Sequence, residues 1–62
     1  MYGVGLVRPM AGGDETEYVA QFGTFGEAHA RALRVAVGPE IVAVVVTDLT
    51  GTGRDVVIRE VV

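Results

Sequence analysis

Cysteine, lysine, serine, asparagine and tryptophan are all missing from this 62-residue chain, and its one histidine is His29. A chain without cysteine can form neither a disulfide nor a thiolate zinc site. Serine and cysteine are also common enzyme nucleophiles, and a single histidine without any lysine leaves few groups for acid–base catalysis. We therefore expect a protein that is not an enzyme and that uses no metal and no cofactor.

Long hydrophobic runs are missing as well. The longest, residues 41–46, is far shorter than the roughly 20 residues that cross a bilayer. Residues 1–9 lack the leading positive charge and the apolar stretch of a signal peptide. These absences predict a cytoplasmic protein that does not enter a membrane.

What the chain does contain narrows its class further. Half of the residues are hydrophobic, which is too many for a disordered chain. All the basic residues are arginine, and amino acids with GC-rich codons dominate, which suggests a phage or actinobacterial source. The formal net charge is −3, whereas nonspecific binding of nucleic acid draws on clustered positive charge. Nucleic acid is therefore not the expected partner.

The length predicts one small domain over residues 1–62, and the order of the elements described below makes it an α+β domain. A chain this short buries only about 60% of the surface that it exposes when unfolded. Small domains usually compensate with disulfides, metals or oligomerisation. Because the composition leaves only the third, we expect a homodimer.

Two segments near the amino terminus alternate between apolar and other residues, as strands do. They cover residues 2–8 and 17–22, with Pro9 expected to end the first. Residues 10–16 are glycine-rich and acidic, so we expect a mobile loop that joins the two strands as a hairpin. The side chains expected to point inward are Tyr2, Val4, Leu6, Tyr18, Ala20 and Phe22.

A helix is predicted over residues 25–37. Thr24 and Glu27 have the spacing of a capping box, and Gly38 followed by Pro39 is a typical stop signal. At about 100° per residue, one side of this helix is apolar. The side chains expected in that buried stripe are Phe25, Ala28, Ala32, Leu33, Val35 and Ala36.

The carboxyl-terminal third predicts two more strands. Residues 41–49 are nearly continuous in hydrophobicity, as expected of an interior strand, and residues 55–62 alternate. The glycine-rich residues 50–54 between them predict a turn. GTGRD at 51–55 has the glycines of a phosphate-binding loop, but such loops open onto a helix, so we expect a hairpin turn.

These elements give a ββαββ fold, a four-stranded antiparallel sheet with a single helix packed on one face. The strand order 2-1-3-4 makes every neighbouring pair antiparallel. The other face would then display more apolar surface than a soluble monomer usually leaves open. The candidate partner-binding residues on that face are Val7, Val19, Val57, Arg59 and Val61, and those on the exposed side of the helix are Arg31 and Arg34.

His29 has only apolar or glycine neighbours along the helix, at Phe25, Gly26, Ala32 and Leu33. A histidine that acts as a general base or a pH-sensitive contact needs polar partners within reach. We therefore expect His29 to pack at the edge of the core or in an interface, with a functional role as the alternative.

Residues 24–32, T-F-G-E-A-H-A-R-A, follow a predicted strand. This run is similar to the strand-to-helix junction of HicB-like antitoxins and also resembles the end of the arm-binding domains of phage integrases. A capped, alanine-rich helix is enough to give the pattern, so the chain is assigned to neither family.

The function predicted from the sequence is a small non-enzymatic protein-interaction module that forms a homodimer. The alternative is an antitoxin-like or nucleic-acid-binding regulator that combines the arginines of two copies. Those arginines are Arg8, Arg31, Arg34, Arg54 and Arg59.

Overall fold

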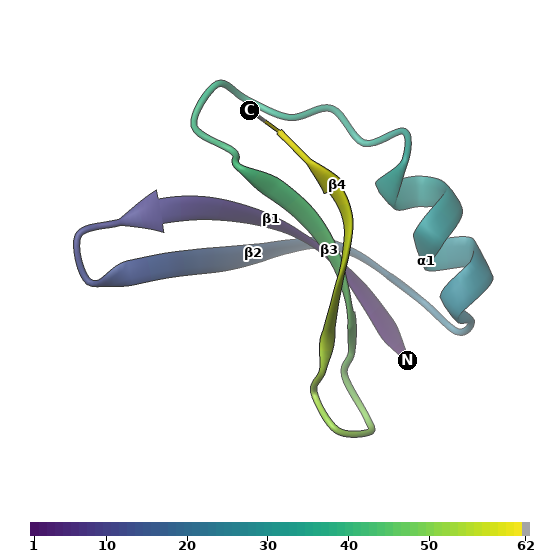
Figure 1. Ribbon diagram of the computed structural model, residues 1–62. Coiled ribbons are helices and arrows are strands. Elements are labelled where there is room, and N and C mark those ends of the chain that lie inside the picture. The colour runs from purple at the N-terminus through teal and green to yellow at the C-terminus, as the bar shows by residue number, and fades with distance from the viewer. Residues whose placement is uncertain (62) are drawn as a thin grey trace.

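The computed structural model describes residues 1–61 and contains, in that range, four strands and one helix. In chain order they are β1 (Tyr2–Met10), β2 (Gly13–Phe22), α1 (Phe25–Ala32), β3 (Ala43–Asp48) and β4 (Asp55–Glu60). The strands form one antiparallel sheet in the order β2-β1-β3-β4, with α1 on one side of it (Figure 1). The predicted ββαββ fold and strand order are therefore confirmed.

The predicted loop over residues 10–16 is wrong, because the hairpin is longer and tighter. Met10 pairs with Gly13, so the connection is a two-residue turn at Ala11 and Gly12. Gly13 has a φ of 128°, a backbone conformation that L side chains rarely adopt. Glycine at this position therefore lets β2 start directly after the turn.

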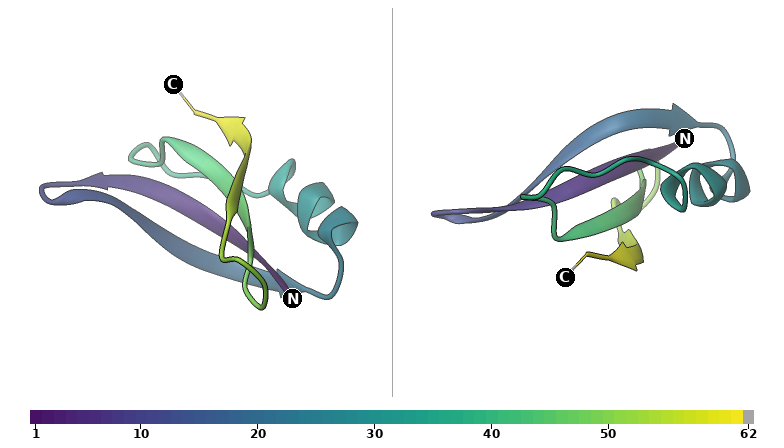
Figure 2. Two further views of the ribbon diagram at one scale, coloured as in Figure 1. Left: turned by 60° about the horizontal axis from the view of Figure 1, so that its bottom comes forward. Right: turned by 90° about the horizontal axis from the view of Figure 1, so that it is seen from above.

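The hairpin end projects beyond the rest of the sheet as a two-stranded arm over residues 8–15 (Figure 2). β3 pairs with β1 only from Tyr2 to Val7, so the arm has no third strand. Pro9 was expected to end β1, yet β1 continues to Met10. Proline is tolerated here because this part of β1 has a neighbour on one side only.

The hydrophobic core lies between α1 and the sheet. Small residues of the helix are fully buried against valines of the two central strands, so the helix backbone approaches the sheet closely. The Thr24 side-chain oxygen accepts a hydrogen bond from the Glu27 N–H at 3.2 Å, which confirms the predicted helix start. The buried core residues are Val4, Leu6, Ala28, Ala32, Ile41, Val44 and Val46.

The helix is shorter than predicted and ends at Ala32 instead of residue 37. The Arg59 guanidinium donates to the carbonyl oxygen of Leu33 at 3.0 Å and to that of Val35 at 2.7 Å. These bonds satisfy carbonyls that have no partner within a helix end. The chain then runs without helical structure, and Val35 and Val37 pack against the core from this segment.

Two residues of the predicted helical stripe, Ala28 and Ala32, are buried, and Val35 is partly buried outside the helix. The prediction is wrong for the other members, since they are exposed. These members are Phe25, Leu33 and Ala36.

Both edge strands contain a β-bulge that the sequence pattern does not reveal. The pairing shifts between Val4 and Gly5, which leaves Val19 as an extra residue in β2. It shifts again between Val44 and Val45, which leaves Ile58 as an extra residue in β4. Each extra residue moves the following side chains to the other face of the sheet.

β3 confirms the prediction of an interior strand, although it is shorter than the predicted range 41–49. Its four central residues, Val44 to Thr47, are all buried. β4 ends at Glu60, two residues before the predicted end, and Val62 lies outside the described residues.

Candidate functional site: the open face of the sheet

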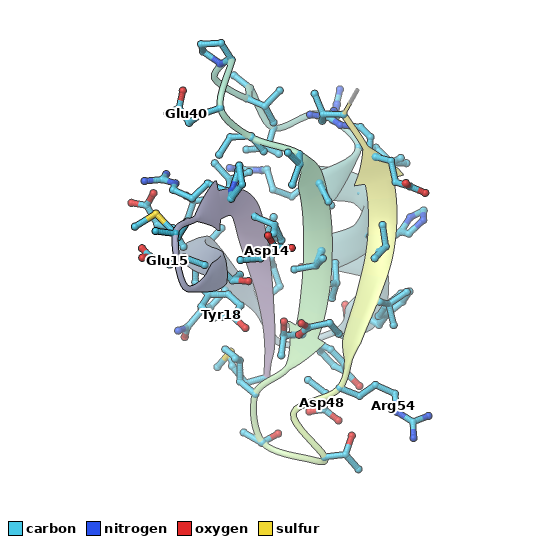
Figure 3. The ribbon with its side chains drawn as sticks, turned by 60° about the vertical axis from the view of Figure 1, so that its left-hand side comes forward. Asp14, Glu15, Tyr18, Glu40, Asp48 and Arg54 are labelled. Atoms are coloured by element: carbon cyan, nitrogen blue, oxygen red, sulfur yellow. The ribbon has the colours of Figure 1, made fainter. Side chains whose placement is uncertain are left out.

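The open face is the side of the sheet turned away from α1 (Figure 3). Residues directly opposite each other in antiparallel strands point to the same side, so the pairing assigns its members. They are Gly3, Gly5, Val7 and Pro9 of β1; Asp14, Thr16, Tyr18 and Gln21 of β2; Ala43, Val45 and Thr47 of β3; and Asp55, Val57 and Glu60 of β4.

Tyr18 lies on this face and not in the core, which corrects the inward orientation predicted for it. The physical reason is the bulge at Val19, which reverses the alternation of β2 between Tyr18 and Ala20. The Tyr18 ring lies over two glycines of β1. A Cβ atom on Gly3 would be 2.9 Å from Tyr18 Cδ1, and one on Gly5 would be 3.2 Å from Tyr18 Cε1. The missing side chains therefore create the space that the ring occupies.

A chain of hydrogen bonds continues from this ring across the sheet. The Tyr18 hydroxyl donates to Thr47 Oγ1 at 2.9 Å, and the Thr47 hydroxyl donates to Asp55 Oδ1 at 2.6 Å. Thr47 is buried, and both its donor and one of its acceptor positions are used. The chain links β2, β3 and β4, so it fixes the side chains of three strands relative to one another.

This arrangement was not predicted, although the sequence contains one signal for it. Gly3 and Gly5 are two positions apart in a strand, so both open on the same face. Such a pair leaves a gap above the strand that a large side chain from a neighbour fills.

The predicted partner-binding valines do not share one environment. Val7 and Val57 are on the open face, and Val57 is 56% exposed. Val19 is exposed at the bulge of the edge strand β2. Val61 follows the last residue of β4, is half-buried, and donates its N–H to the Val42 carbonyl at 2.9 Å.

Arg59 is not on the open face, which corrects the prediction. It is paired with Val44, a core residue on the helix side, because the bulge at Ile58 shifts the alternation of β4. Its guanidinium group is bonded to the end of α1, as described above. Glu60 takes the place expected for Arg59, opposite Ala43.

The charges of the two sides differ as a result. The open face carries the carboxylates of Asp14, Asp55 and Glu60, and within residues 1–61 no arginine is placed there. Figure 3 shows Asp14 on this side, whereas Arg54 at the β3–β4 turn points away from the sheet.

The other arginines lie on the helix side. Arg8 forms an ion pair with Glu17, whose strand partner is the core residue Leu6. The Arg31 guanidinium lies 5.6 Å from the centre of the Phe22 ring, and Arg34 is exposed just after α1. The predicted helical candidates therefore share a side of the molecule with Arg59.

His29 lies at the margin of the core. It is half-buried, and its ring centre is 5.8 Å from that of Phe25. Phe25 in turn contacts Tyr2 edge to face, with the ring centres 5.9 Å apart. This aromatic cluster is compatible with the packing role expected for His29.

The β3–β4 connection is a hairpin turn, as predicted for residues 50–54. Asp48 Oδ1 accepts hydrogen bonds from the backbone N–H groups of Thr50 at 3.2 Å and Gly51 at 2.9 Å. A carboxylate of the chain therefore occupies the amides that a bound phosphate would use.

Residues 1–61 enclose no pocket, and in the same range no cluster of acidic and histidine side chains is placed to hold a metal ion. The described part of the chain also lacks a helix of the length and hydrophobicity needed to cross a membrane. No known protein family, curated protein or solved structure matches this chain.

Proposed function

We propose that this chain is a small protein-interaction module and that the open face binds a second copy of the chain. The observation that carries the proposal is the exposure of apolar side chains on the open face, beside the hydrogen-bond chain of Tyr18, Thr47 and Asp55. Val57 is the most exposed of these residues, and Tyr18 and Leu49 are also exposed beside the glycines of β1. Burying such side chains between two proteins is favourable. The smallest assembly of this kind is a homodimer.

The strand edges are poor alternatives for association. The edge strands β2 and β4 each contain a bulge, at Val19 and at Ile58. Pro9 lies on the free part of β1, and the arm carries several acids. Bulges, proline and charge on edge strands all oppose the addition of another strand. A partner that contacts the sheet therefore meets the open face and not an edge.

The acidic character of the open face supports a protein over a nucleic acid as the partner. Phosphate groups would meet the carboxylates of Asp14, Asp55 and Glu60. Two of the five arginines, Arg8 and Arg59, are already used in contacts within the chain. The phage or actinobacterial source and the cytoplasmic location stay predictions and do not enter this proposal.

The size of the molecule limits how strongly two copies are expected to associate. A stable interface buries roughly 800 Å² of each partner. The described surface totals 3957 Å², so such an interface would take about a fifth of it. We therefore expect association that depends on protein concentration.

Two adjacent valines of β4 provide the test. Val57 and Val56 are exposed by 56% and 43%, but Val57 belongs to the open face and Val56 is paired with the core residue Val46. Light scattering behind size exclusion should show a mass that rises with concentration for the natural chain and for Val56→Asp. Val57→Asp should stay monomeric with an unchanged circular dichroism spectrum. Equal masses for Val57→Asp and the natural chain would exclude the open face as the contact.

A further inference from the structure

We infer that the open face of one copy binds the outer side of α1 of the next copy, so that the chains associate head to tail. This inference rests on the function proposed above and adds the surface that the open face recognises. The recognised surface, called the helix patch here, consists of Ala30 and Arg31 of α1 and of Leu33 and Arg34 directly after it, all of which are exposed.

The helix patch lies on the opposite side of the molecule and combines two exposed apolar side chains, Ala30 and Leu33, with two arginines. Leu33 is 51% exposed, although it belongs to the apolar stripe of the sequence. Ala30 is two residues from each of the buried alanines of α1, which at about 100° per residue turns it away from the sheet.

The two arginines of the patch add positive charge to this end of α1. The Arg31 guanidinium is positioned over the Phe22 ring, and Arg34 is exposed. The nearest acid on the helix, Glu27, is engaged by the Thr24 hydroxyl at 3.0 Å at the other end of α1. The end of the helix that carries Leu33 is therefore positively charged.

The charges decide between the possible pairings of these two surfaces. Two open faces together would bring the carboxylates of both copies against each other, and two helix patches would do the same with arginines. Opposite charges meet only when an open face contacts a helix patch. The same pairing places exposed Val57 against exposed Leu33, so apolar burial and charge favour the same arrangement.

A head-to-tail contact has a consequence that a symmetric dimer lacks. Each dimer keeps one free open face and one free helix patch, so further copies add until a ring closes or a filament forms. The mass should therefore grow beyond that of a dimer as the concentration rises. It should fall when salt is added, because surface charges are screened.

Complementary variants test this arrangement. Val57→Asp blocks the open face and leaves the helix patch intact, whereas Leu33→Asp blocks the helix patch and leaves the open face intact. Each variant alone should be monomeric at the 6.5 kDa mass of one chain. An equimolar mixture should form a complex of twice that mass and no larger species, since each chain contributes one usable surface. Thr52→Asp adds the same charge at the exposed β3–β4 turn and should assemble like the natural chain.

The outcomes separate this inference from the proposed function. If Leu33→Asp assembles like the natural chain while Val57→Asp does not, the open face is the contact but its counterpart is not the helix patch. If neither substitution changes the assembly, or if the natural chain is monomeric at every concentration, both proposals fail. Arg34→Glu provides a second route that removes no apolar side chain: it should weaken assembly at low salt, and an unchanged mass would contradict the role of charge.

Discussion

The two faces of the sheet are closed in different ways. On the helix side, alanines of α1 pack against valines of β1 and β3 in a cluster of buried apolar residues. On the open face, β1 contributes glycines, and the Tyr18 side chain lies across them from the neighbouring strand. One face is covered by an element of the fold and the other by a side chain.

This difference shows how a 62-residue chain protects a sheet without a second layer. Val45 points to the open face yet is only 3% exposed, because side chains of β2 reach over the glycines toward it. Val57 lies directly opposite Val45 on β4 and is left exposed. The cover therefore ends between β3 and β4, and the apolar contact surface is confined to the part that Tyr18 does not reach.

The largest effect is expected on the helix side. Ala28 is fully buried against the sheet, whereas Ala36, in the segment after α1, is exposed. Ala28→Asp buries an unpaired carboxylate, and we expect a loss of about 4 kcal/mol or more in the free energy of unfolding, enough to unfold a domain of this size. Ala36→Asp should stay within about 0.5 kcal/mol of the natural chain, because this alanine is exposed and lies outside the helix patch. Thermal unfolding followed by circular dichroism measures both, and a folded Ala28→Asp chain would show that the helix is not tightly packed.

A smaller loss of stability is expected when a glycine of the open face, Gly5, is replaced. A Cβ atom at Gly5 would be 2.5 Å from Thr16 Cγ2 and 3.2 Å from Val45 Cγ2. Gly5→Ala should therefore destabilise the chain by about 1–3 kcal/mol, the usual range for overpacking. Gly23→Ala is the matched control, because no atom lies within 4 Å of its added carbon.

A second substitution distinguishes steric overlap from a change in the strand itself. Thr16→Ser removes the methyl group that the new carbon of Gly5→Ala meets first. The double variant should recover part of the lost stability in chemical denaturation. Equal destabilisation of the single and double variants would show that the overlap with Thr16 is not the cause.

The parts of the fold that were predicted correctly have local causes. The helix start follows from Thr24 and Glu27, which are three residues apart and make the predicted contact. The strand order follows from alternation and from antiparallel pairing of neighbours. Val7 and Val57 were correctly predicted to lie on the open face. β1 contains no extra residue, and Val57 comes before Ile58, the extra residue of β4.

The errors have causes that lie far away in the sequence. The bulges at Val19 and Ile58 leave the apolar pattern of their strands unchanged, so the pattern alone cannot reveal that the faces switch. The helix ends early, at a place where Arg59, 26 residues after Leu33, donates to its carbonyl oxygen. The Tyr18–Thr47 hydrogen bond likewise joins residues 29 positions apart. Such contacts are properties of the folded sheet and have no local signature.

The smallest effect is expected for the hydrogen-bond chain on the open face. Tyr18→Phe keeps the ring over the glycines and removes only the hydroxyl that donates to Thr47. We expect a loss of about 1 kcal/mol in the free energy of unfolding, the typical net contribution of such a bond. Tyr2→Phe removes a hydroxyl from the helix side, where the ring packs on Phe25, and should change stability less.

A double-mutant cycle shows whether the bond acts together with its neighbour. Asp55→Asn alters the acceptor at the other end of the chain, where the Thr47 hydroxyl donates. If the three side chains act as one unit, the loss from Tyr18→Phe should be smaller in the Asp55→Asn background than in the natural chain. If the two losses simply add, the Tyr18 hydroxyl and the Asp55 carboxylate contribute to stability independently. The Tyr18 ring would then close the open face by packing over the glycines, and the polar chain would not hold the three strands together.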